Sequence, residues 1–387
     1  MRIQAIDSLR GLAILGILTM NIGFHVNILT GYVSLDPPLV SDKVILIIQA
    51  IFADGRFRSL FCIIFGVGLA ILYERGQQKQ IDPIIYLKSR LFWLFIIGLI
   101  HAAFIFGGDI LMLYALAGYI VIKHLPKDPE EILRLGKRRF IAGSVMCVIL
   151  GILAILFTPP EDIITRSSEA FASKYAFLNA NYLYYIGANA GIALVLLIFS
   201  FLSIIWQVFG LMLIGMYLYH SNFFVNGFSR SALYKTAFLA VVTTSLSLTP
   251  YALQENVDAT VTPLLASVPA IFVSLIYAHV FIRLSKDNGW LMRTLNNCGK
   301  VALSLYIFQS VSMAVLFKIV LASTYPDYIA SISLLHLMGI TAMLTVVQML
   351  LANWLVSHYE QGPLEYIWRK VYTKRYESKT AKISEQI

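Results

Sequence analysis

Charged residues are scarce in this chain. They make up 13% of the 387 residues, whereas 58% of the residues are hydrophobic. Soluble globular proteins carry about 25% charged residues, so the composition excludes an ordinary soluble chain. Apolar runs long enough to cross a hydrocarbon layer ~30 Å thick recur from end to end. Because no stretch reads as a detachable soluble domain, we expect residues 1–387 to form a single polytopic membrane domain.

The motifs of several enzyme classes are also missing. The three cysteines form no CxxC or Cys/His spacing and no HExxH is present, so we expect neither disulfides nor a metal site. The absence of Walker A, GxGxxG and GxSxG motifs leaves nucleotide-driven pumping and nucleophile-elbow chemistry without support. The net charge of +9 is better explained by cytoplasmic loops facing anionic membrane lipids than by nucleic acid.

The apolar runs predict an all-α integral membrane protein with about ten transmembrane helices. The first run has no small-residue cleavage site after it, so we interpret it as a retained helix rather than a signal peptide. The predicted spans are 9–28, 57–74, 86–106, 109–125, 139–158, 194–219, 232–251, 261–283, 298–322 and 329–357.

The loop charges predict how these helices are oriented. Lysine and arginine collect in 75–90, 123–139, 283–300 and the basic tail 358–387, whereas the alternate loops are richer in acids. The positive-inside rule then places both termini in the cytoplasm. Two outer loops, 29–56 and 159–193, are longer than simple connections. The first contains an expected interfacial helix, and the second is either a lid or a plain cover.

Two ionisable residues lie where a membrane segment ordinarily has none. His101 and Asp109 flank the turn Phe106-Gly107-Gly108 between two apolar helices, and we expect them to be neighbours inside the bundle. Arg90 precedes His101 by eleven residues, so it lies on nearly the same helix face, about 16 Å nearer the cytoplasm. We interpret His101 as a candidate base, because imidazole is suited to proton transfer at neutral pH.

The first helix carries a similar polar stripe. Asp7 and Arg10 lie three residues apart, suited to a local ion pair at the cytoplasmic end. Asn21 follows Arg10 by eleven residues on the same face, and His25 comes one turn later. Asn21 is either a catalytic hydrogen-bond donor or an amide that joins two helices.

Other polar residues interrupt the later spans. Arg56 and Arg58 stand at the outer entrance of the second helix, against the charge bias, and either bind an anion or pair with Asp54 or Asp109. Tyr306 and Gln309 share a face of the ninth span, and either contact a substrate or connect helices.

Six separated phrases carry a resemblance to a known family: IDSLRG, RFRSLFCIIFGVGL, GLIHAAFIFGGDILMLYALAG, IWQVFGLMLIG, GKVALSLYIFQS and QGPLEYIWR. In this order they resemble the YeiB-like family of bacterial multipass membrane proteins, over essentially the whole chain. Leu305 departs from the asparagine usual at that position of the ninth-helix motif. The resemblance implies a multipass protein of the bacterial cytoplasmic (inner) membrane.

That family is distantly similar to the transmembrane acyltransferase superfamily, which includes heparan-α-glucosaminide N-acetyltransferase. The remote match rests on Asp7, Arg10, Gly11 and Asn21. It implies an acyltransferase-like helix bundle, with acyl-CoA as the cytoplasmic co-substrate and a sugar or lipid-linked acceptor at or beyond the outer face. The histidine of the glucosaminide enzyme follows its asparagine at a longer spacing than His25 follows Asn21, so that role is not transferred to His25.

On this hypothesis Arg10 and Arg90 bind the phosphates of the coenzyme. His101 acts as base, Asp109 holds its tautomer, and Asn21 donates a hydrogen bond to the developing oxyanion. Arg56, Arg58, Tyr306 and Gln309 are the candidate substrate-binding residues.

A transporter or flippase for a lipid-linked or anionic solute is the alternative function, although the sequence shows no inverted repeat or matching pair of Gly/Pro-broken helices. A third hypothesis is that the chain is a non-catalytic membrane accessory protein. Homo-oligomer formation is left open as well.

Overall fold

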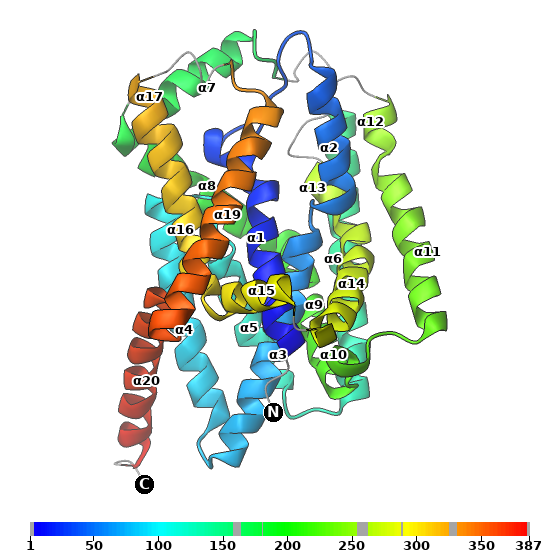
Figure 1. Cartoon of the computed structure of the whole chain (residues 1–387), viewed down its shortest axis with the longest axis vertical. Coiled ribbons are helices and arrows are strands. Elements are labelled where there is room, and N and C mark those ends of the chain that lie inside the picture. Colours follow the sequence, from blue (N-terminus) through cyan, green and yellow to red (C-terminus); the bar gives the residue numbers. More distant parts are fainter. Residues whose placement is uncertain are drawn as a thin grey trace.

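The computed structural model describes residues 4–157, 164–179, 181–253, 262–287, 289–324 and 331–384. Within these ranges the regular structure is entirely helical, so the predicted all-α class is confirmed (Figure 1). In the described segments α1 (Gln4–Val26) begins and α20 (Pro363–Ser384) ends at the lower end of the view in Figure 1. This placement agrees with termini on one side of a membrane, and the side itself stays a prediction.

Nine helical stretches in these segments are long and apolar enough to cross a membrane. Helices of this kind satisfy their own backbone hydrogen bonds, as a lipid environment requires. The nine stretches are Gln4–Val26 (α1), Val40–Gln78 (α2 and α3), Pro83–Phe104 (α4), Pro129–Phe157 (α6), Tyr182–Leu202 (α8), Arg230–Tyr251 (α11 and part of α12), Ser267–Leu284 (α14), Ala302–Thr324 (α16, η4 and α17) and Leu334–Tyr359 (α19). The chain is therefore a multipass membrane protein.

The remaining helices, and those that make up the composite stretches, complete the bundle. They are α2 (Val40–Phe52) and α3 (Arg56–Gln78) within the second stretch, then α5 (Leu111–Val121), α7 (Glu169–Asn179), α9 (Ile204–His220), α10 (Phe223–Asn226), α11 (Arg230–Ser247), α12 (Thr249–Leu253), α13 (Thr262–Leu265), α15 (Trp290–Lys300), α16 (Ala302–Ala314) and α17 (Leu321–Thr324). A π-helical segment, η4 (Val315–Val320), joins α16 to α17. The apolar stretches Leu111–His124 and Ile204–His220 are below the length of the nine candidate spans.

The predicted span 194–219 is wrong in its bounds, because two helices share it. Helix α8 ends at Leu202 and α9 starts at Ile204, on either side of Ser203, whose φ of −143° and ψ of −86° are not helical. The Ser203 hydroxyl donates to the carbonyl of Phe199 at 3.1 Å. Such a bond back to the preceding turn competes with the helix, and a continuous apolar run gives no sign of it.

Two segments predicted as loop or tail are mostly helical. The outer loop 159–193 contains α7 and the first half of α8, whose Asn181 side chain accepts hydrogen bonds from the backbone of Leu183 and Tyr184 as an N-cap. Residues 158–163 and 180 lie outside the described part. The tail from 358 onward forms α20, which packs along α4, where the Trp368 indole donates to the carbonyl of Arg90 at 3.1 Å.

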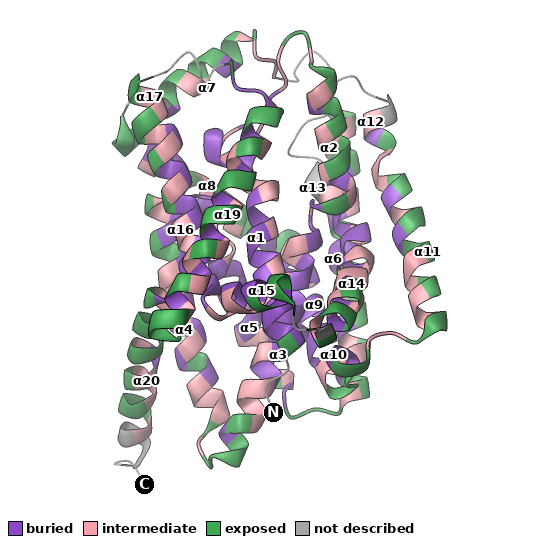
Figure 2. Cartoon of the chain, in the orientation of Figure 1, coloured by how far each residue is buried: buried purple, intermediate pink, exposed green. Residues whose placement is uncertain are grey.

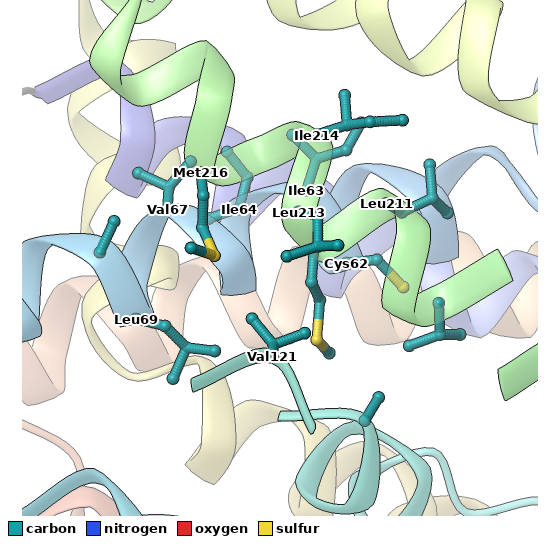
Figure 3. Close-up of a cluster of buried hydrophobic side chains, with 14 of the residues drawn as sticks. Cys62, Ile63, Ile64, Val67, Leu69, Val121, Leu211, Leu213, Ile214 and Met216 are labelled. Atoms are coloured by element: carbon teal, nitrogen blue, oxygen red, sulfur yellow. The ribbon is translucent and has the colours of Figure 1, made fainter. Parts of the chain in front are cut away.

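The centre of the bundle is a close packing of α3 against α9. Figure 3 shows Cys62, Ile63, Ile64 and Val67 of α3 facing Leu213 and Met216 of α9. Glycines permit this approach, since a Cβ added at Gly66 would lie 2.0 Å from the carbonyl oxygen of Met212. Small residues let membrane helices approach closely and gain van der Waals contact.

The outer faces of the bundle carry apolar side chains. On α11, Phe238, Val241 and Leu246 are more than 60% exposed, and Figure 2 shows exposed residues along this helix and along α20. An apolar exterior around a more buried centre is suited to contact with lipid tails.

Candidate functional site

The candidate site lies at the turn between α4 and α5, where His101 and Asp109 meet. The Nδ1 atom of His101 is 2.8 Å from Oδ2 of Asp109, and both side chains are buried. The expected contact between these two residues is therefore present, while its chemical role stays a prediction. We call this pair the His101–Asp109 dyad.

The local sequence explains why the turn brings the two residues together. Helix α4 ends near Phe104, and the backbone N–H groups of Ile105 and Phe106 both donate to the carbonyl of His101. Gly107 then passes close to α8, where an added Cβ would lie 2.6 Å from the carbonyl oxygen of Asn189. The Asn189 side chain accepts from the Gly107 backbone N–H at 3.0 Å and fixes the turn.

Asp109 is held by three donors. Its Oδ1 accepts from the backbone N–H of Met112 at 2.9 Å, so the carboxylate provides an acceptor for a backbone N–H that has no partner within the first turn of α5. Its Oδ2 accepts from His101, and the hydroxyl of Tyr306 lies 3.4 Å away. A carboxylate at Nδ1 selects the tautomer in which Nε2 has a lone pair.

The other ring nitrogen of His101 has no hydrogen-bond partner among the residues that the structure describes. Nε2 is buried, although a buried polar atom ordinarily has one. The Tyr306 ring lies 5.0 Å from the imidazole, and the Phe106 ring lies 6.4 Å away on another side. Nε2 is thus the nitrogen of the dyad that is left without a partner, and a base would accept a proton at this atom.

Helix α1 contributes to the surroundings of the dyad through His25. The His25 ring stacks on Phe106 with 4.0 Å between centroids. Asn21 lies one turn earlier on the same face of α1 and is half-buried, with no hydrogen bond recorded for its amide among the described residues. Asn21 therefore shares a face of α1 with His25, whose ring lies against Phe106 of the turn beside the dyad.

Lys318 is a polar residue near this site that the sequence analysis did not single out. It lies in η4, donates to the carbonyl of Val26 at 2.8 Å and sits 5.3 Å from the centroid of the Tyr185 ring. Single π-helical turns are frequent at functional sites. A lysine inside an apolar run was the feature of the sequence that could have identified this residue. Residue types alone do not predict the π-helical geometry around it.

The two arginines proposed for coenzyme phosphates have different partners. Arg10 pairs with Asp7 at 2.8 Å, as expected, and lies 3.4 Å from the carbonyl of Gly299 at the end of α15. Arg90 stacks on Trp368 at 4.1 Å and donates to the hydroxyl of Tyr372 at 3.2 Å, both on α20. Arg10 thus lies against α15 and Arg90 against α20, so the two arginines contact different helices.

Gln309 has the contacts of a packing residue. Its amide donates to the carbonyl of Ile14 at 2.9 Å and to the side chain of Gln348 at 3.0 Å. Gln348 donates in turn to the carbonyl of Leu305 at 3.1 Å. These bonds connect α1, α16 and α19, so the alternative of an amide that joins helices describes Gln309 better than substrate contact does.

Arg56 and Arg58 lie in the first turn of α3. Arg56 is fully buried and donates to the carbonyl of Asp54 at 2.5 Å. Neither arginine forms an ion pair with Asp109, whose carboxylate is occupied by His101, Met112 and Tyr306. The sequence predicts that these arginines bind an anion or pair with Asp54 or Asp109. Asp54 is in contact with Arg56, through its backbone carbonyl oxygen.

Fold and site together define the class: a multipass all-helical membrane protein with a buried histidine–carboxylate pair. A family model described as "Protein of unknown function (DUF418)" matches residues 218–375. The chain is 26% identical to the uncharacterized protein YeiB of Escherichia coli (strain K12), with 95% of each chain covered.

Two further relatives also align with nearly the whole chain. The uncharacterized protein YxaH of Bacillus subtilis (strain 168) is 22% identical, over 95% of this chain and 93% of its own. An uncharacterized 39.9 kDa protein in the amylase 3' region of Bacillus acidopullulyticus is 25% identical, over 97% and 94%. The predicted resemblance to YeiB-like proteins is therefore confirmed over nearly the whole length.

Proposed function

We propose that this chain is a membrane-embedded acyltransferase of the bacterial cytoplasmic membrane. It moves an acyl group from a cytoplasmic acyl-CoA to a hydroxyl of a sugar or lipid-linked acceptor at or beyond the outer face. The observation that carries the proposal is the His101–Asp109 dyad, a buried pair with 2.8 Å between Nδ1 and Oδ2, whose Nε2 has no hydrogen-bond partner among the described residues.

The dyad supports the proposal because acyl transfer to a hydroxyl needs a base. In the proposed step Nε2 of His101 takes the hydroxyl proton while the acceptor oxygen bonds to the thioester carbonyl carbon. The C–S bond then breaks, and the leaving thiolate receives that proton from the imidazolium. Asp109 holds the ring and stabilises its charged form during the step, and Asn21 donates to the oxyanion.

The donor is placed by the cytoplasmic arginines. The Arg90 guanidinium uses its face against Trp368, so its in-plane N–H groups are oriented for phosphate oxygens. A phosphate would add to, or replace, the bond from Arg90 to Tyr372. Arg10 would contribute a second cation from α1 while it remains paired with Asp7.

We expect acyl-CoA to raise the melting temperature of the purified protein in an uncharged detergent, because a ligand that binds only the folded state stabilises it. Acetyl-CoA and palmitoyl-CoA are compared, and release of the CoA thiol in the presence of a membrane extract reports turnover. Arg90→Gln should reduce the shift. Arg139→Gln is the matched control, since Arg139 also stacks on an aromatic ring, that of Trp206, but on another helix pair. No shift with either thioester would contradict the donor assignment.

One observation favours a second candidate, a transporter for an anionic solute. The stretch Val40–Gln78 is broken between α2 and α3, close to residue 57, where the predicted second span starts. Broken membrane helices are common where transporters bind their substrates. In proteoliposomes a transporter would move a labelled anion across the membrane without releasing CoA thiol, whereas an acyltransferase would release the thiol without net anion movement.

A further inference from the structure

The break between α2 and α3 exposes polar groups inside an apolar stretch. Helix α2 ends at Phe52, and α3 starts at Arg56, after Ala53, Asp54 and Gly55. Gly55 has a φ of +74°, a left-handed conformation that favours glycine. Figure 1 shows α2 in the upper part of the view and α3 continuing below it. The break therefore lies within the bundle rather than at one of its ends.

Helix α14 covers the break. A Cβ added at Gly55 would lie 3.1 Å from the Cβ of Ala270. The hydroxyl of Ser274 donates to the carbonyl of Arg56 at 2.6 Å, and that of Tyr277 donates to the carbonyl of Phe52 at 2.8 Å. These bonds satisfy the carbonyl oxygens on both sides of the break, so what remains there is a surplus of donors.

The surplus donors belong to three side chains at the start of α3. Arg56 is 0% exposed, and within the described part of the chain its Nε and Nη2 have no hydrogen-bond partner. Nη2 of Arg58 and the hydroxyl of Ser59, which is also fully buried, have none either. Buried polar groups that lack a partner lose their hydration without compensation, so native structures rarely leave several of them together.

The charges around these donors do not balance. The start of α3 carries two guanidinium groups and the positive end of a helix dipole. Asp54 is the carboxylate nearest in sequence, and its side chain forms no ion pair with either arginine within the described residues. Asp54 attracts both guanidinium groups but carries at most one negative charge, so one positive charge is left over between the buried Arg56 and the half-buried Arg58, where an uncompensated charge is costly.

We infer that the break between α2 and α3 is a binding site for an oxyanion, a phosphate or carboxylate group, held by Arg56, Arg58 and Ser59. Guanidinium groups present paired N–H donors that match the oxygens of such anions, and a serine hydroxyl can donate a further bond. The anion is either a free ion or part of a lipid head group, and both present the same oxygens. The inference does not depend on acyl transfer.

The test measures the stability of purified, delipidated full-length protein against inorganic phosphate at constant ionic strength, with chloride as the balancing salt. Phosphate should raise the melting temperature of the wild type. Arg56→Gln and Arg58→Gln should each weaken phosphate binding by about tenfold or more, the loss expected for a charge-assisted hydrogen bond. Arg75→Gln removes an exposed cation at the other end of the same helix, and it should leave phosphate binding unchanged.

Asp54→Asn separates the proposal from a simple counter-ion role. Removing this carboxylate should strengthen phosphate binding, because one negative charge next to the site is lost. If Asp54 only neutralises the arginines, Asp54→Asn should lower the melting temperature equally with and without phosphate, which would overturn the proposal. If Arg56→Gln does not accumulate as folded protein, Arg58→Gln and Asp54→Asn provide the test.

A second arm identifies the source of the anion. Nanodiscs of phosphatidylcholine alone are compared with nanodiscs that also contain phosphatidic acid. Retention of phosphatidic acid by the wild type after detergent extraction, and its loss in Arg58→Gln, supports a lipid head group. Phosphate binding without lipid retention supports a free ion, and the absence of both phosphate binding and lipid retention in the wild type overturns the inference.

Discussion

Replacing His101 by glutamine should abolish acyl transfer while the protein stays folded. The loss expected for removing a positioned base is about 10²–10⁴-fold. Glutamine remains polar and can still donate toward Asp109, which keeps its bonds from Met112 and Tyr306. The measurement is transfer of a labelled acyl group, together with the melting temperature with and without acyl-CoA.

His279 offers a matched control for this experiment. Its Nδ1 accepts from the backbone N–H of Phe228 at 2.9 Å, near the end of α14, so its role is structural. His279→Gln should lower the melting temperature and leave transfer unchanged. If His101→Gln behaves in the same way, with reduced stability and full activity, the dyad is a packing element and the catalytic assignment is wrong.

Gly66→Ala should destabilise the protein more than most single substitutions, although alanine favours helices. Its Cβ would lie 2.0 Å from the carbonyl oxygen of Met212, which is backbone and cannot rotate away. Gly215 on α9 makes the reciprocal contact, where a Cβ would lie 2.1 Å from the carbonyl oxygen of Ile63. Forcing these helices apart should cost roughly 1–3 kcal/mol or more.

Gly68 is the internal control, since it lies two residues away on the same helix with no atom within 4 Å of the position of its added Cβ. Gly68→Ala should be neutral or stabilise the protein by about 0.5–1 kcal/mol, the helix-propensity difference between glycine and alanine. Melting temperatures in detergent report both variants. Equal effects at the two positions would contradict the close packing of α3 and α9.

The short helix α5 links the two polar sites of the bundle. Its first turn is capped by Asp109 of the dyad, and the hydroxyl of Tyr114 lies 3.4 Å from the carbonyl of Arg58. Helix α5 is therefore in contact with the proposed base at one end and with the proposed anion site further along. A ligand at either site that shifts this helix would alter the other, which gives the two proposals a common structural element.

Residue types alone determined the class of this protein and part of its site. Scarce charge and recurrent apolar runs are sufficient to predict a multipass helical membrane protein, because the hydrocarbon layer admits few other structures. The dyad was also predictable. A two-glycine turn returns the chain beside itself, and burying His101 and Asp109 unpaired would be costly, so the sequence contained both the geometry and the reason for the contact.

Only the tertiary structure decided where the run 194–219 breaks and which polar residues meet across the bundle. The break at Ser203 involves a hydroxyl bond to the preceding turn, and the apolar pattern continues through it. The break before α3 is different, because Asp54, Gly55 and Arg56 mark it in the sequence. Arg90 contacts α20, Arg10 contacts α15, and Gln309 contacts Gln348. The partners in each contact are far apart in the sequence, so the local hydrophobic periodicity does not predict these contacts. Hydropathy measures the cost of leaving water, which is the same for a residue facing lipid and a residue facing another helix, and therefore it specifies the spans without specifying their partners.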